Sequence, residues 1–138
     1  MKVTKVKLEV TDAVDIVTTA IEGGINYWGE CKGYDWKSFY ENYDDTKYLM
    51  DQVYRDIPRN EILVSVREDL DASGEDKPVT DGNPWVGITI QNLEDAVCEV
   101  LNSKYAHLIT ITDNEIDVDA TGAEVIFQFV VFGDVIFG

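Results

Sequence analysis

The segment VIFQFVVFG, residues 125–133, is apolar on nearly every side and limits the possible folds more than any other stretch. Because no face of such a segment is suited to water, it must be buried between other elements. We expect a fully buried helix over about residues 122–132, preceded by Thr121 and Glu124 at the spacing of a capping box. Its β-branched and aromatic residues leave a pair of strands as the alternative.

A chain of 138 residues, 45% of them apolar, can bury a core of this kind within one domain. Its charge is one-sided, because 11 Lys and Arg stand against 27 Asp and Glu, a net charge of −16. Such a field repels phosphate backbones and anionic membranes. We therefore expect no direct binding to nucleic acid and no membrane association.

The cysteines and the N-terminus indicate the compartment. Cys31 and Cys98 are far apart and form no disulfide framework, which favours a reducing environment. The first ten residues lack an apolar h-region, and no run approaches the roughly 18 apolar residues of a membrane span. We expect a cytoplasmic protein.

Hydrophobic periodicity predicts the other elements. Strands are expected where apolar and polar residues alternate or cluster: 3–10, 61–67, 85–88 and 105–112. Helices are expected where apolar residues recur every three or four positions: 13–30, 90–104 and, as one or two short helices, parts of 34–57. Asp12 and Thr89 would cap the two longer helices, and Gly33 would end the first. With an acidic loop over about 68–84, the predicted fold over residues 1–138 is a single α+β domain, a small antiparallel sheet packed against three or more helices.

Gly23 and Gly24 lie inside the first predicted helix, in the stretch IEGGINYWGE. Each glycine inside a helix costs roughly 1 kcal/mol relative to alanine, so a compensating contact is expected. One account is close packing, in which another helix, such as the C-terminal one, lies against the bare backbone. The other is a slot between aromatic walls that binds a polar, nucleotide-like ligand. Besides the glycines, the slot residues would be Glu22, Asn26, Tyr27 and Trp28.

Aromatic residues concentrate in one region, since nine of the fifteen fall between residues 27 and 54, interleaved with carboxylates. Tyrosine and tryptophan supply rigid contact area with a polar tip, which suits a protein interface, and the acidic field would steer a basic partner. A locally aromatic core beneath loops is the alternative. The predicted interface residues are Tyr34, Trp36, Tyr40 and Tyr43.

Two acidic stretches approach the calcium loop of an EF-hand, and each lacks an essential part. In DLDASGEDKPVT the twelfth position is Thr80 instead of the bidentate glutamate, and in DNEIDVDATGAE the sixth is Val118 instead of glycine. The single histidine, His107, has an apolar setting, and no catalytic motif is present. We expect no metal, no cofactor and no enzymatic activity.

The stretches VTTAIEGGINYW and DVDATGAEVIFQFVVFGDVIFG resemble the two ends of a family of small acidic proteins encoded by tailed phages and prophages. Members of that family begin with an ALEGGINYW-like helix and finish with a QxxxFGxxxYG-like tail. The resemblance implies a phage context and carries no activity or catalytic residues. By analogy with small early phage proteins that counter host defences, we expect a non-enzymatic protein that inhibits a host factor with a basic surface. Sequestration of a nucleotide-like ligand and a structural or assembly role in the phage particle are the alternatives.

Overall fold

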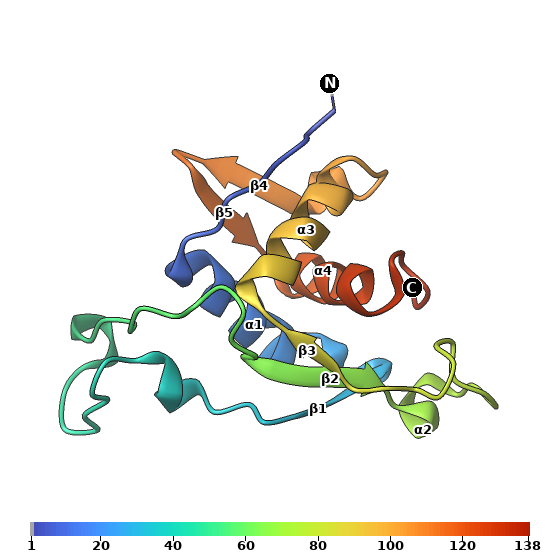
Figure 1. The fold of residues 1–138 in the computed structure, drawn as a ribbon, viewed down its shortest axis with the longest axis horizontal. Helices are drawn as coiled ribbons and strands as arrows, with labels where there is room; N and C mark the ends of the chain where they lie inside the picture. The colour runs from blue at the N-terminus through green and yellow to red at the C-terminus, as the bar shows by residue number, and fades with distance from the viewer. Residues whose placement is uncertain (1) are drawn as a thin grey trace.

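Residues 2–138 are described by a computed structural model, in which helices and small antiparallel sheets surround one hydrophobic core (Figure 1). The helices are α1 (Val10–Gly23), α2 (Leu70–Ser73), α3 (Ile90–Leu101) and α4 (Ala120–Phe132). The strands are β1 (Gly29–Lys32), β2 (Val64–Glu68), β3 (Val86–Ile88), β4 (Ile109–Thr112) and β5 (Glu115–Val118). Short 3-10 turns cover Ile25–Tyr27, Trp36–Phe39, Leu49–Asp51 and Ala106–Leu108. The predicted α+β class is confirmed, and among residues 2–138 no helix is both long and apolar enough to span a bilayer.

The buried helix α4 lies at the centre of the fold, where α1 and α3 pack against it. Every residue from 122 to 129 is buried, which confirms the helix and excludes the alternative pair of strands. The predicted capping box is wrong, because Asp119 caps the helix by accepting from the Gly122 N–H at 2.9 Å. The Glu124 carboxylate instead points into the core and accepts a hydrogen bond from Trp28.

Two separate antiparallel sheets replace the one small sheet that was predicted. One has the order β1-β2-β3, and its central strand turns Val64 and Val66 into the core. The other is the hairpin of β4 and β5, joined by Asp113 and Asn114 at φ of +48° and +68°. Two consecutive left-handed residues are typical of a type I′ hairpin turn. Strand β5 was not predicted, because its acidic residues also fit a calcium-like loop.

Residues 3–10 form no strand, contrary to the prediction, and α1 already begins at Val10. Side chains of α3 and of its C-cap residue take the place of a neighbouring strand. The Asn102 side chain accepts from the Val3 N–H at 2.7 Å, and Glu94 accepts from the Leu8 N–H at 2.7 Å. Because these two backbone N–H groups donate to side chains, they do not require hydrogen bonds to a neighbouring strand.

Asp12 is not the N-cap of the first helix, because Glu9 occupies that position. Asp12 lies one turn inside α1, where its buried carboxylate accepts from the Glu9 N–H at 3.1 Å and from the Ile116 N–H at 3.3 Å. It therefore ties the start of the helix to β5. At the other end the helix stops at Gly23, seven residues before the predicted end, and Gly33 follows β1 at a φ of +74°.

The remaining predictions hold in outline. α3 begins after Thr89, whose hydroxyl accepts from the Asn92 N–H at 3.1 Å, so this predicted cap is confirmed. The strands predicted over 61–67, 85–88 and 105–112 appear as β2, β3 and β4, each shorter than predicted or shifted by a few residues. The one or two short helices predicted within 34–57 appear as two 3-10 helices. The acidic loop over 68–84 contains α2 and is anchored by the buried Glu68, which accepts from Ser73 Oγ and from the Val79 N–H, both at 2.8 Å.

Candidate functional site

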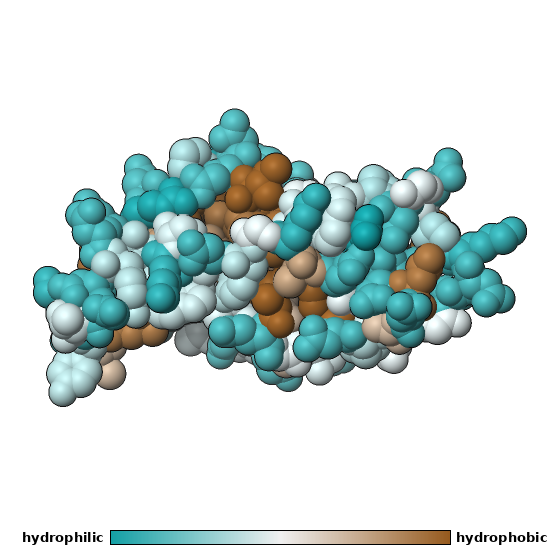
Figure 2. Space-filling view, turned by 90° about the horizontal axis from the view of Figure 1, so that it is seen from below, coloured by the Kyte–Doolittle hydropathy of each residue, from teal (hydrophilic) through white to brown (hydrophobic). Residues whose placement is uncertain are grey.

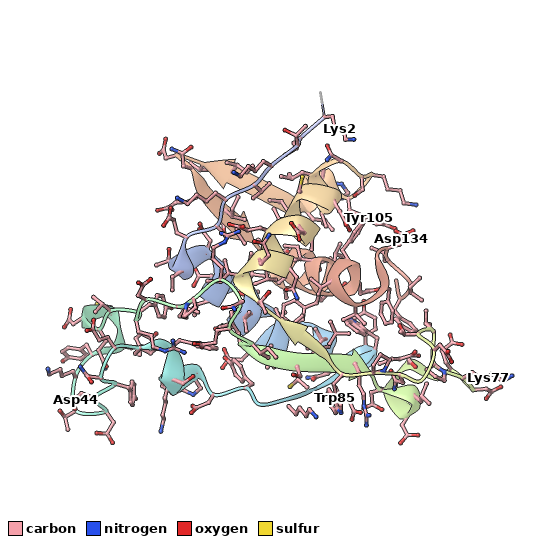
Figure 3. The ribbon with its side chains drawn as sticks, viewed as in Figure 1. Lys2, Asp44, Lys77, Trp85, Tyr105 and Asp134 are labelled. Carbon is pink, nitrogen blue, oxygen red and sulfur yellow. The ribbon has the colours of Figure 1, made fainter. Side chains whose placement is uncertain are left out.

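Residues 34–56 form an extension that we call the aromatic arm, drawn in teal to green at the left of Figure 1. A bridge between Tyr40 and Tyr54 closes its stem. Beside the bridge, the Glu41 N–H donates to the Val53 carbonyl and the Arg55 N–H donates to the Phe39 carbonyl, both at 2.9 Å. These contacts give the arm a hairpin-like stem without regular strands. Figure 3 shows Asp44 in the arm and Lys77 in the acidic loop at opposite ends of the molecule.

The outer part of the arm, residues 44–53, is called the arm tip and is held by its own hydrogen bonds. The Gln52 amide accepts from the Asp44 N–H at 2.9 Å and donates to the Asp44 carbonyl at 2.7 Å. Thr46 adds two bonds to the Asp44 carboxylate, from its N–H at 2.9 Å and from its hydroxyl at 2.6 Å. The tip therefore has a defined shape, although water surrounds much of it.

Large apolar side chains of the arm tip are exposed to water. Met50 is 90% exposed and Tyr48 is 79% exposed, and Leu49 and Val53 are exposed as well. Exposed carboxylates of Asp45 and Asp51 lie in the same segment, and that of Glu41 lies shortly before it. Most of the face in Figure 2 is hydrophilic, with hydrophobic residues in the middle and smaller groups toward both ends, of which the left is the end to which the arm extends. Exposed apolar side chains that gather in one segment among carboxylates are typical of interaction sites.

The base of the arm is a cluster of aromatic rings that contains the four predicted interface residues. Trp36 meets the ring of Tyr43 edge-on, with centroids 5.2 Å apart, and the ring of Tyr40 in the same way at 6.2 Å. Tyr34 packs beneath them against Phe39, at 6.1 Å. The four predicted interface residues therefore lie in the packed base of the arm, as the alternative of an aromatic core under loops predicts, and the exposed residues of the tip were not among those predicted.

A concave pocket of about 400 Å³, the arm pocket, opens between the base of the arm and α1. Its lining combines aromatic rings of the arm with a polar stripe of the helix. The arm contributes Trp36, Phe39, Tyr40, Leu49 and Tyr54, and α1 contributes Val14, Asp15, Thr18 and Glu22. Of the predicted site residues, the pocket brings together Glu22, Trp36 and Tyr40. Asp15, Thr18 and Tyr54 were missed, although positions 15, 18 and 22 of a helix share one face, which is a detectable signal.

Negative charge in the arm pocket is not neutralised by the protein itself. Within residues 2–138, neither Asp15 nor Glu22 takes part in an ion pair. Partial burial raises the pKa of Asp15, and the nearby Asp12 and other carboxylates raise it further. Burial, followed by the neighbouring Tyr40 side chain, likewise raises the pKa of the Tyr54 phenol. The pocket is thus an aromatic site of negative potential.

The glycine doublet does not lie inside a helix as predicted, because Gly23 is the last residue of α1 and Gly24 is its C-cap. The close-packing account is nevertheless confirmed. A Cβ placed on Gly24 would lie 2.9 Å from the Ala120 carbonyl oxygen and 3.0 Å from Glu124 Cβ. On Gly23 it would lie 3.2 Å from Ala120 Cβ. The bare backbone therefore lets the end of α1 touch the start of α4.

Trp28 cannot wall an open slot, because its side chain is 0% exposed. Its indole N–H donates to Glu124 Oε2 at 3.1 Å. Phe132 lies 5.4 Å from the Trp28 ring, and Phe137 stacks parallel to it at 6.2 Å. Both Tyr27 and Trp28 were predicted to line the slot. In the structure Trp28 is buried in the core, whereas Tyr27 is 42% exposed.

A shallow depression of about 420 Å³ does remain beside the doublet, lined by Gly23, Gly24, Tyr27, Ala120, Thr121, Glu124 and Gly138. Tyr27 donates to the Phe137 carbonyl at 3.2 Å, and burial followed by the nearby Glu124 raises its pKa to about 12. Glu22 lines the arm pocket instead, and Asn26 is exposed on the 3-10 turn after α1. The predicted recognition surface is therefore divided between two places.

The two stretches that resemble the phage family pack against each other as one unit. Gln128, which is 0% exposed, accepts from the N–H groups of Ile136 and Phe137 at 2.8 and 2.9 Å. Its amide donates to the Phe137 carbonyl and to Glu124 Oε2, both at 2.8 Å. These hydrogen bonds fix the C-terminal tail, and Phe137 of the tail stacks on Trp28. The EGGINYW segment and the QxxxFG segment are therefore in contact.

The two calcium-like stretches serve structural roles. The Asp69 side chain caps α2 by accepting from the Asp71 and Ala72 N–H groups, and Asp119 caps α4. In the part of the chain described here, residues 2–138, no three His, Cys, Asp or Glu side chains gather as a metal site would require.

Comparison of the chain with protein-family models, with curated proteins and with solved structures found no match. The phage context stays a prediction from the two terminal stretches.

Proposed function

We propose that this protein is a non-enzymatic binding protein that docks its aromatic arm onto a basic surface of another protein. One observation carries the proposal: a hydrogen-bonded arm presents Tyr48 and Met50, 79% and 90% exposed, among carboxylates and far from the core. Exposed aromatic and methionine side chains with a charged surround match the composition of protein interfaces. A net charge of −16 would steer a basic partner toward such a surface.

The partner we propose is a host defence factor, which the protein would inhibit by covering its basic surface. The resemblance of the terminal stretches to phage proteins supports this context. The division of the molecule supports it too, because those stretches build much of the core while the arm tip has no buried residue. A tip without buried residues can adapt to one partner without loss of the fold.

The arm accounts for binding better than the depression beside the glycine doublet does. A nucleotide-like ligand is anionic, and the lining of the depression contains the carboxylate of Glu124 and no Lys or Arg. Two of the cations that could have served it are engaged elsewhere, since Arg55 pairs with Glu61 and Arg59 pairs with Glu94. Sequestration of a small anion is therefore the weaker candidate.

Affinity capture from the bacterial host, compared between variants, tests the proposal. We expect the wild-type protein to retain a host protein, and Met50→Asp to weaken that binding by about 2 kcal/mol, or roughly thirtyfold. Val79→Asp is the matched control, because Val79 is also apolar and 46% exposed but lies in the acidic loop. Retention should also fall with rising salt.

The purified partner then gives Kd values for the three proteins by calorimetry. Equal binding by wild type and Met50→Asp would refute docking through the arm tip. Binding that does not change with salt would refute the charge-steered, basic partner.

A further inference from the structure

We propose that the arm pocket receives one basic side chain of the partner, an arginine guanidinium or a lysine ammonium. The inference depends on the proposed function for the identity of its occupant, since it names the group on the partner that the arm would recognise. The pocket shares only Leu49 with the arm tip, and its carboxylates belong to α1. Its lining and its charge can therefore be tested without the partner.

The rings of the pocket suit a cation. Aromatic faces attract ammonium and guanidinium groups within about 6 Å of the ring centroid. The ring centroids of Tyr40 and Tyr54 lie 4.8 Å apart, and the ring planes are inclined by 33°. The ring plane of Trp36 is at 90° to that of Tyr40. The neighbouring Lys37 shows that this cluster already draws a cation, because its Nζ lies 5.9 Å from the Trp36 centroid and 5.6 Å from that of Tyr43.

The helix side of the pocket supplies charge. Asp15 and Glu22 are seven residues apart, which places them about 10 Å from each other along α1, with Thr18 between them. Across residues 2–138, neither carboxylate accepts a hydrogen bond from a side chain or a backbone N–H within the chain. The raised pKa of Asp15 indicates that its ionised form lacks a compensating group. A bound guanidinium could donate to one carboxylate while its plane lies on a ring.

The size and chemistry of the lining favour an organic cation over a metal ion. A volume of about 400 Å³ is large for a single ion and lies within the range of sites for small organic groups. Calcium and magnesium require six or more oxygen ligands, whereas aromatic and aliphatic side chains form more than half of this wall. The geometry therefore points to a partially apolar cation such as a basic side chain.

The first experiment titrates the ¹⁵N-labelled protein with N-acetyl-arginine amide and, separately, with N-acetyl-citrulline amide. Citrulline has nearly the same shape as arginine and no charge. We expect arginine amide to shift the backbone resonances of Thr18, Tyr40 and Tyr54 in a saturable way, and citrulline amide to leave them nearly unchanged. Equal shifts with both compounds, or none with arginine amide, would overturn the proposal.

The second experiment repeats the titration with Asp15→Asn/Glu22→Gln. The matched control is Asp71→Asn/Glu75→Gln, which removes the same two charges from exposed positions in the acidic loop. Loss of two charge-assisted contacts should weaken arginine amide binding by roughly tenfold or more, whereas the control should stay within about twofold. Equal weakening in both variants would mean that arginine amide responds to net charge alone, and this outcome would refute the site.

The test separates the pocket from the proposed function. Met50→Asp should leave the affinity for arginine amide unchanged, because Met50 does not line the pocket. If arginine amide binds while Met50→Asp fails to weaken a host partner, the pocket stands and docking through the tip falls. If the host partner binds through the tip while arginine amide does not, the pocket proposal fails alone. Spectra of the folded variants check that each keeps its structure.

Discussion

Replacing Gly24 by alanine should destabilise the protein because the added methyl group meets the backbone of another helix. The new Cβ would lie 2.9 Å from the Ala120 carbonyl oxygen and 3.0 Å from Glu124 Cβ. Optimal contacts between carbon atoms are about 3.5–4.0 Å, so the start of α4 would have to move by roughly 0.5–1 Å. Overpacking of this kind costs about 1–3 kcal/mol. The movement would also disturb Glu124, which holds the Trp28 indole at 3.1 Å.

The neighbouring change, Gly23→Ala, provides the internal comparison. Its Cβ would lie 3.2 Å from Ala120 Cβ, a contact with a side chain instead of a carbonyl group. Gly23 is the last helical residue of α1, where alanine is favoured over glycine by up to about 1 kcal/mol. The two effects oppose each other, so we expect a net change within about 0.5 kcal/mol of zero.

Urea unfolding followed by circular dichroism and by tryptophan fluorescence measures both variants. A loss of about 2 kcal/mol in Gly24→Ala corresponds to a fall of roughly 1 M in the urea midpoint at an ordinary m-value. The reasoning is refuted if Gly24→Ala unfolds at the wild-type midpoint. It is equally refuted if Gly23→Ala loses as much stability as Gly24→Ala, because the backbone clash would then not be the cause.

Three further changes test polar side chains, of which Gln128 and Glu94 are buried and Asp15 is exposed on α1. Gln128→Leu should lower the free energy of unfolding by about 2–4 kcal/mol and shift tryptophan emission to the red, because the amide that binds the N–H and the C=O of Phe137 is lost. A Tm and an emission maximum equal to those of the wild type would contradict this prediction. The pKa of Asp15 is raised in the folded protein, so the stability of the wild type falls as pH rises through that pKa. Asp15→Asn should therefore increase the free energy of unfolding at neutral pH by less than about 1 kcal/mol and leave it unchanged well below pH 4. Urea midpoints that differ equally at both pH values would contradict this prediction. The pKa of Glu94 is lowered, because Arg59 and a backbone N–H outweigh the burial that would raise it. The stability it contributes is present above its unfolded pKa and disappears as pH falls through the folded value, so Glu94→Gln should flatten the acid limb of the stability curve.

Several elements could be predicted from sequence because their signals are local. The stripe of apolar residues in α3 and the cap at Thr89 lie within a few residues of each other, and the structure confirms both. The all-round apolar character of α4 required burial in any fold, and the helix is buried. The β4–β5 hairpin also had a local signal, since Asp113 and Asn114 are residue types that accept a left-handed conformation.

Other predictions failed because their outcome depended on distant partners. Alternation over residues 3–10 is compatible with a strand, but no strand lies beside this segment, and Asn102 and Glu94 satisfy its backbone instead. The first helix ends early because the chain must turn to bring the Trp28 indole to Glu124, 96 residues away. Periodicity within one segment carries no information about such a partner.

The same distinction applies to the candidate site. Composition alone showed a region dense in aromatic residues and carboxylates, and the recognition surface predicted between residues 22 and 54 followed from it. Which rings are buried and which are exposed was decided by tertiary structure, since Trp28 lies under the C-terminal tail and Tyr48 lies in water. The arm pocket likewise exists because packing sets the polar stripe of α1 against the arm. Residue types determine what a side chain can bind, whereas contacts between segments far apart in the chain determine which side chains meet.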